Sequence, residues 1–202
     1  MKLNRLAALA AAPAVLTLAL AGCAAGAGDT GMPGMSHGPG MSSPSASTQT
    51  DVSMADSMFA MMMIPHHQQA IEMSDMILAK SGVDERVREL ATQIKAAQGP
   101  EIELMEGWLR EWGMPSSGGA DDMGHGDGMM SADDMAALES AEGSAAARLF
   151  LEQMIEHHEG AIEMAEEELR RGSDPDVLAL AERIIEAQAA EIDTMRELLT
   201  QI

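Results

Sequence analysis

The feature that most constrains the fold of this chain is an internal repeat. Residues 63–73 have the sequence MIPHHQQAIEM, and residues 154–164 have the closely similar sequence MIEHHEGAIEM. Each copy is followed by a glutamine, a glutamate and a methionine that are equally spaced among themselves in both halves, namely Gln98, Glu101 and Met105 in the first and Gln188, Glu191 and Met195 in the second. The chain therefore contains two copies of one supersecondary unit.

Both halves favour helix, because no strand-like alternation of useful length occurs and aromatic residues and valine are scarce. We predict helices over about residues 52–80, 84–112, 132–171 and 174–201. Gly82 and Gly172 stand where glycines commonly end helices, and Pro65 predicts a kink, or a break just before the histidines. Short connections make each half an antiparallel hairpin. The predicted fold is all-α, a four-helix bundle of two repeated αα-hairpins.

The second helix of each half carries an apolar stripe with a glutamine at its centre. At about 100° per residue, the two stripes contain Val87, Ala91, Ile94, Gln98, Ile102, Met105, Leu109 and Trp112, and Val177, Ala181, Ile184, Gln188, Ile192, Met195, Leu199 and Ile202. A buried amide without a partner costs roughly 1–3 kcal/mol. The same interruption in both halves predicts a shared polar pocket.

The histidine doublets are the candidate partners of these glutamines and the candidate metal ligands. Adjacent histidines point about 100° apart on a helix, so each doublet is expected to span the inside and the edge of the bundle. A methionine lies four residues before the second histidine, on the same helical face. The candidate ligands are His66, His67, Met63, Met73, His157, His158, Met154 and Met164.

Imidazole and thioether together suit a soft or borderline ion, so copper is the expected metal, with Cu(I) favoured and Cu(II) as the other state. The residues expected to support the ligands are Gln98, Glu101, Met105, Gln188, Glu191 and Met195. For Glu101 and Glu191, a solvated helix face remains an equal alternative. For the histidines, the alternative is that they are hydrogen-bonded core residues without a metal.

The first residues have the pattern of an export signal. Lys2 and Arg5 precede an apolar stretch that is too short to span a membrane. Leu20-Ala21-Gly22-Cys23 resembles the bacterial lipobox, in which the cysteine is lipidated. An ordinary secretory signal is the alternative. We expect a signal peptide over residues 1–22, a disordered linker over 23–50, and the bundle over 51–202 with a loop at about 114–131.

Two glycine-rich islands combine methionine and histidine where no core is expected. They offer Met32, Met35, His37 and Met41 in the linker, and Met123, His125, Met129 and Met130 between the two halves. Burial does not explain methionine in such loops, so we expect auxiliary metal capture. Low-complexity sequence with chance methionines is the alternative.

The formal net charge of −21 makes nucleic acid an unsuitable partner, because phosphate binding requires cations. An acidic surface instead concentrates cations and keeps the protein soluble. The single cysteine excludes a disulfide within one chain.

The repeated element resembles the hallmark of the DUF305 family, His-His-x-x-Ala-x-x-Met. His66, His67, Ala70 and Met73 match it in the first copy, and His157, His158, Ala161 and Met164 match it in the second. The resemblance covers about residues 52–201. It implies a ferritin-like four-helix bundle, and members have been linked to copper binding and resistance outside the cytoplasm. Gly160 replaces Gln69 and Glu156 replaces Pro65, so the two sites need not be equivalent.

The leading hypothesis is a copper-binding lipoprotein, not an enzyme, that faces the extracytoplasmic side and sequesters copper, confers resistance or transfers the metal. Its expected partners are the metal ion, the membrane through a lipid anchor at Cys23, and a copper-handling protein. One alternative is a ferritin-like di-iron oxidase, which needs four carboxylates and two Glu-x-x-His pairs that the doublets do not supply. The other is a metal-free bundle of the cell envelope, in which histidine–glutamine hydrogen bonds fix the helix register.

Overall fold

The computed structural model describes residues 52–115 and 128–202. Within these ranges the chain forms helices only: α1 (Met54–Ala79), α2 (Glu85–Glu111), α3 (Ala132–Ser140), α4 (Gly143–Arg171) and α5 (Pro175–Leu199). Within the same ranges, no helix is both apolar enough and long enough to cross a bilayer. The prediction of an all-α bundle is confirmed.

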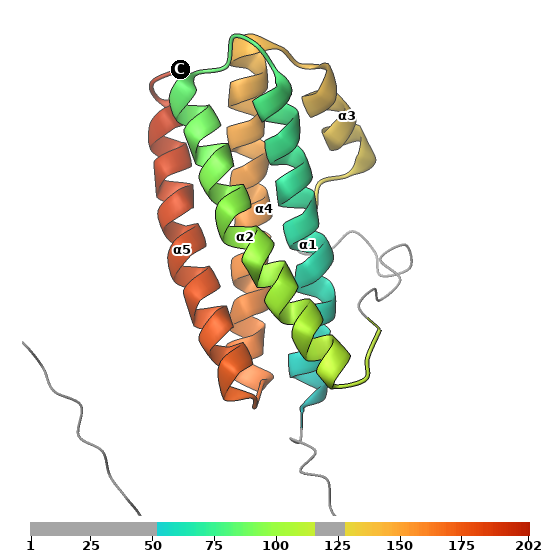
Figure 1. The fold of residues 1–202 in the computed structure, drawn as a ribbon. Helices are drawn as coiled ribbons and strands as arrows, with labels where there is room; N and C mark the ends of the chain where they lie inside the picture. The colour runs from blue at the N-terminus through green and yellow to red at the C-terminus, as the bar shows by residue number, and fades with distance from the viewer. Residues whose placement is uncertain (1–51, 116–127) are drawn as a thin grey trace, which may run out of the picture. The chain divides into compact units, whose positions relative to one another are not determined.

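Two antiparallel hairpins make up the bundle, as Figure 1 shows. Helices α1 and α2 pack against each other along their length, and so do α4 and α5. The two hairpins meet mainly through α1 and α4, while the short helix α3 packs on the outside of these two. The helix pairing follows the internal repeat.

The single helix predicted over residues 132–171 is wrong, because the chain breaks it into α3 and α4. Ala141 and Glu142 are extended, and Gly143 has φ +55°. Gly143 also lies close to the α1–α2 turn, since a Cβ built on Gly82 would be 3.5 Å from the Gly143 Cα. The break thus lets one inter-helix turn pack against the start of α4.

At Pro65 the alternative of a helix break is wrong, whereas Gly172 caps the end of α4 as expected. Helix α1 continues through Pro65, so no break precedes the histidines. Gly82 does adopt a left-handed conformation, with φ +74°, but Gly172 has φ −68°. Gly172 is required for space instead, because a Cβ at this position would collide with the Glu168 carboxyl group.

The core consists of two apolar clusters. Cluster 1 contains buried residues from every helix, among them Met73, Ile94, Leu138, Phe150, Met154 and Met195. Cluster 2 draws on the opposite ends of the four long helices and includes Phe59, Met63, Met105, Leu109, Ala161 and Leu180. Along each long helix the two clusters are separated by one short stretch of polar residues, at positions 66–67, 98–101, 157–158 and 188–191. We call these stretches together the polar layer.

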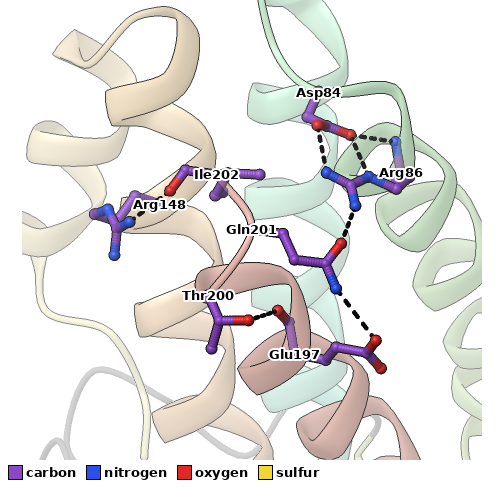
Figure 2. Close-up of polar contacts among 7 residues, drawn as sticks. All are labelled: Asp84, Arg86, Arg148, Glu197, Thr200, Gln201 and Ile202. Carbon is purple, nitrogen blue, oxygen red and sulfur yellow. Dashed lines mark hydrogen bonds and ion pairs between the residues drawn. The ribbon is translucent and has the colours of Figure 1, made fainter.

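A surface network joins the end of α5 to the starts of α2 and α4, as Figure 2 shows. Arg86 donates to Asp84 at 2.8 and 2.9 Å and also to Gln201. Arg148 donates to the carbonyl oxygen of Ile202 at 2.8 Å. Exposed contacts of this kind each contribute little stability, so they position the chain end rather than hold the bundle together.

A buried carboxyl pair joins the start of α1 to the α4–α5 turn. Asp56 is fully buried and accepts hydrogen bonds from the backbone N–H groups of Ser53, Ser173 and Asp174 at 2.7, 2.8 and 3.1 Å. Burial alone would raise the pKa of Asp56, but bonds from Ser173, Glu168 and Asp174 outweigh it and lower this pKa. Burial, with the bond to Asp56, raises the pKa of Glu168 to about 8. Glu168 is therefore protonated at neutral pH and donates to Asp56.

This pair predicts a stability that falls as the pH rises from 4.5 to about 8. In that window the folded state retains the Glu168 proton, whereas an unfolded glutamate with a pKa near 4.5 has lost it. Asp56 has the opposite effect, but only below its ordinary value of 3.8. The substitution Glu168→Gln keeps a donor for Asp56 and removes the titration, so it should reduce the decline measured by urea unfolding between pH 5 and 8.

The control is Glu182→Gln, which changes an exposed carboxylate on α5. It should leave the pH profile of the wild-type protein unchanged. Equal slopes for Glu168→Gln and wild type would show that Glu168 carries no extra proton in the folded state.

Candidate metal centre

The centre of the polar layer is a contact between one histidine from each hairpin. The His66 and His157 rings lie with centroids 3.7 Å apart and planes tilted by 39°. All four doublet histidines are at most 1% exposed, so the second histidine of each doublet does not lie at the bundle edge as expected. The α1–α4 interface therefore buries both doublets.

The second histidine of each doublet bonds to the repeated glutamate of its own hairpin. His67 Nε2 lies 2.8 Å from Glu101 Oε2, and His158 Nε2 lies 2.6 Å from Glu191 Oε2. A carboxylate oxygen accepts, so Nε2 donates, and in a neutral ring with this tautomer Nδ1 is an acceptor. Both Nδ1 atoms are buried and form no hydrogen bond with the described residues. A carboxylate that orients a histidine in this way is common beside metal ions.

His157 is held in its neutral form. Burial lowers the pKa of His157 well below its ordinary value, and the nearby imidazoles of His66, His158 and His67 lower it further. The His66 backbone opposes this shift, yet neither ring nitrogen of His157 makes a hydrogen bond of normal geometry within the described chain. Neutral imidazole is the form that binds metal ions.

The two repeated glutamines complete the polar layer, as their position in the apolar stripes predicts. Gln98 is 2% exposed and Gln188 is 3% exposed. Neither Gln98 side-chain atom nor the Gln188 Oε1 atom has a partner in the described part of the chain. Unpaired buried amides cost about 1–3 kcal/mol each, so contacts among the described residues alone do not account for glutamine at these positions.

Methionines border the layer on both sides. Met63 and Met105 are buried in cluster 2, and Met154 and Met195 are buried in cluster 1. Met73 lies in cluster 1, seven residues or about 10 Å along α1 from His66. Met63 and Met154 therefore lie about one helical turn from the histidines of their own helices, and Met73 is further along α1.

Met164 occupies a different environment from its counterpart Met73. It is partly exposed and lines a surface cleft between α1 and α4. The repeat in sequence therefore does not produce the same surroundings for the two methionines.

One side of the layer is covered by the segment before α3. Gln69 exchanges two hydrogen bonds with the Met130 backbone, at 2.7 and 2.9 Å. Gly160 leaves room for Gly128, because a Cβ on Gly128 would lie 2.9 Å from the Gly160 Cα. Gln69 and Gly160, which occupy the same position of the two repeats, thus both contact the segment before α3. The sequence alone did not predict this contact.

The predicted capture residues of the second island divide into two groups. Met130 is 4% exposed and belongs to cluster 1, so burial does explain this methionine, contrary to expectation. Met129 is partly exposed. The remaining predicted capture residues and the lipidation site lie outside the described residues: Met32, Met35, His37, Met41, Met123, His125 and Cys23.

The donor set fits a soft ion better than a hard one. Across residues 52–115 and 128–202, no three histidine, cysteine, aspartate or glutamate side chains are arranged to hold a metal ion. Coordination here would therefore combine at most two imidazole nitrogens, from among His67, His157 and His158, with thioether sulfur from Met63 or Met154. Because the His66 and His157 rings touch, they would have to move apart to admit an ion between them.

The fold and layer define a class of helical bundle whose two hairpins enclose histidines bordered by methionines. The family model described as "Domain of unknown function (DUF305)" matches residues 56–199. The chain belongs to the DUF305 family. No curated protein gives a significant match.

Several solved structures share the fold. A DUF305 protein from Streptomyces coelicolor, described as a candidate secreted protein, is 36% identical with a TM-score of 0.67, covering 73% of this chain and 93% of its own. A DUF305 fragment from Deinococcus radiodurans is 32% identical with a TM-score of 0.69, covering 75% and 99%. CopM in its Cu(I)-bound form is 34% identical with a TM-score of 0.61, covering 72% and 96%. CopM is also known in Cu(II)-bound, Ag-bound and apo forms.

The histidine–glutamate bonds predict a matched pair of destabilised variants. Glu191→Ala leaves the His158 Nε2–H buried without its acceptor and should lower the free energy of unfolding by about 1–3 kcal/mol. Glu191→Gln retains an acceptor oxygen and should lower it less. Urea unfolding of the metal-free protein at neutral pH measures both changes.

Glu186→Ala, at an exposed position on the same helix, is the control and should cost little. Glu101→Ala should behave like Glu191→Ala because it breaks the equivalent bond of the first hairpin. If Glu191→Ala were as stable as Glu186→Ala, the bond would contribute nothing to the fold.

Proposed function

We propose that this protein binds copper outside the cytoplasm through methionine and histidine side chains, and sequesters or transfers it without catalysing a reaction. The observation that carries the proposal is the polar layer itself, in which neutral His157 and the Nδ1 atoms of His67 and His158 are buried between methionines. Nitrogen and thioether donors without a thiolate suit Cu(I) and also accommodate Cu(II).

Similarity to copper-bound relatives supports the choice of metal. CopM is known with Cu(I), Cu(II) and silver, and about a third of aligned residues are identical to this chain. Silver is a close chemical analogue of Cu(I), so a relative that takes both is consistent with thioether ligands.

The proposed location and attachment rest on the sequence and on one relative. The Streptomyces coelicolor protein is described as a candidate secreted protein, and the first residues of this chain have an export pattern that ends in Cys23. A lipid on Cys23 would tether the bundle, because the acidic chain would otherwise be repelled by anionic membranes. A copper-handling protein would then deliver or receive the ion.

The di-iron oxidase alternative gains no support from the layer. Such centres use four carboxylates that point inward, and the repeated carboxylates here are Glu101 and Glu191, each engaged by a histidine.

An anaerobic Cu(I) titration against a chromophoric chelator tests the proposal. The wild-type protein should bind Cu(I) with a much higher affinity than Zn(II). His157→Leu fills the space of the ring and removes its nitrogens, so it should weaken the affinity of the layer at least tenfold, the lower end of the effect seen for groups that merely orient ligands. Replacing all four doublet histidines by alanine should abolish binding in the layer.

Glu72→Ala, at an exposed position of α1, is the control, and circular dichroism reports whether each variant is folded. Copper binding that persists unchanged in a folded His157→Leu protein and in the four-histidine variant would place the metal elsewhere. Zn(II) binding equal to Cu(I) binding would overturn the copper assignment, and no binding of either ion would favour the metal-free bundle.

A further inference from the structure

A cleft with three methionines opens on the surface near the cluster 2 end of the α1–α4 interface. Its volume is about 340 Å³, and its walls include Met58 and Met62 from α1 and Met164 from α4. Met58 is 41% exposed, and Met62 and Met164 are partly exposed. These sulfurs are thus accessible to an ion from solution, unlike the buried Met63 and Met154.

Helix geometry brings the three side chains to one level. Met58 and Met62 are four residues apart, so they are neighbours on one face of α1. His66 meets His157, and α1 and α4 run antiparallel. Met164 lies seven residues after His157 on α4. Because the helices are antiparallel, the position opposite it on α1 is seven residues before His66, and this position falls between Met58 and Met62.

Charged side chains of both signs surround the three methionines. Arg170 and Arg171 line the cleft and pair with Glu167 at 2.7 and 2.6 Å. Glu163, which also lines the cleft, is exposed and lies outside these ion pairs. The preference for a soft ion therefore rests on the three thioethers, since a hard ion would need several oxygen ligands.

We propose that Met58, Met62 and Met164 form a second soft-metal site, which binds Cu(I) or Ag(I) through three thioether sulfurs and is separate from the polar layer. The proposal rests on the proposed copper-binding function and extends it to a surface position. Met164 is seven residues along α4 from His157, or about 10 Å, so one ion cannot be held by both groups.

The position of the site also suggests its role. Met62 lines the cleft, and the next residue, Met63, is buried beside the polar layer. An ion bound at the surface by Met62 would therefore have a second, buried thioether close by, that of Met63 on the same helix. The surface site would act as an entry point for copper, and the buried layer would retain it.

Titration of the full chain with Ag(I), followed by NMR of 13C-labelled methionine methyl groups, tests this site directly. Ag(I) is diamagnetic, and the signals of Met58, Met62 and Met164 are assigned from single Met→Leu variants. These three signals should shift together with one equivalent of Ag(I). The combined variant M58L/M62L/M164L, which keeps the apolar shape, should bind one equivalent less.

Met54→Leu is the control, because Met54 is a more exposed residue of α1 that does not line the cleft. It should leave the stoichiometry unchanged. The same titration in His157→Leu separates the two sites, because the three cleft signals should still shift when the layer is impaired.

Three outcomes would overturn the proposal. Shifts confined to other methionines would remove the cleft site while leaving copper binding by the layer intact. Cleft signals that shift only when His157 is present would make the cleft part of the layer. Absence of any methionine shift, together with failure of the Cu(I) titration above, would remove both the site and the proposed function.

Discussion

The hydrogen bond between a histidine and the glutamate of its own hairpin fixes the register on which the bundle depends. His67 reaches Glu101 and His158 reaches Glu191 at 2.8 and 2.6 Å. A slip of one turn between the helices of either hairpin would move these partners about 5.4 Å apart and leave a buried imidazole unpaired. Apolar side chains alone tolerate such slips more readily, because they have no required partner.

The register places the two apolar clusters on opposite sides of one polar layer. Burial in both clusters supplies the driving force for folding, while in the layer between them the Nδ1 atoms of His67 and His158 and the Gln98 amide have no hydrogen-bond partner among the described residues. A bundle selected for stability alone would place apolar residues at these positions, since replacing both members of a buried polar pair can be neutral or stabilising. The metal binding proposed above would account for histidine and glutamine at these positions in both hairpins.

Sequence periodicity was sufficient to predict this layer but not the contacts between helices. The stripes around Gln98 and Gln188 depend only on residues within one helix, so a 3.6-residue period identifies them. The Asp56–Glu168 pair joins residues from two helices, and its formation depends on how those helices cross. The sequence does contain one indication that Glu168 is buried. Glu168 follows Ala161 and Ala165 at helical spacing, which places a carboxyl group on an apolar helix face. The contacts of Gly128 with Gly160 involve backbone packing, which no periodicity reveals.

The repeated sequence also predicted more symmetry than the structure contains. Helix α3 packs on α1 and α4, and it contributes the fully buried Leu138 to cluster 1. Among the described residues, no helix covers the equivalent surface at the cluster 2 end, where the cleft of Met58, Met62 and Met164 lies. Met73 and Met164 match in the motif, yet one is sealed in the core and the other faces solvent. The insertion between the hairpins thus differentiates two copies of one element, closing one end of the α1–α4 interface and leaving thioethers accessible at the other.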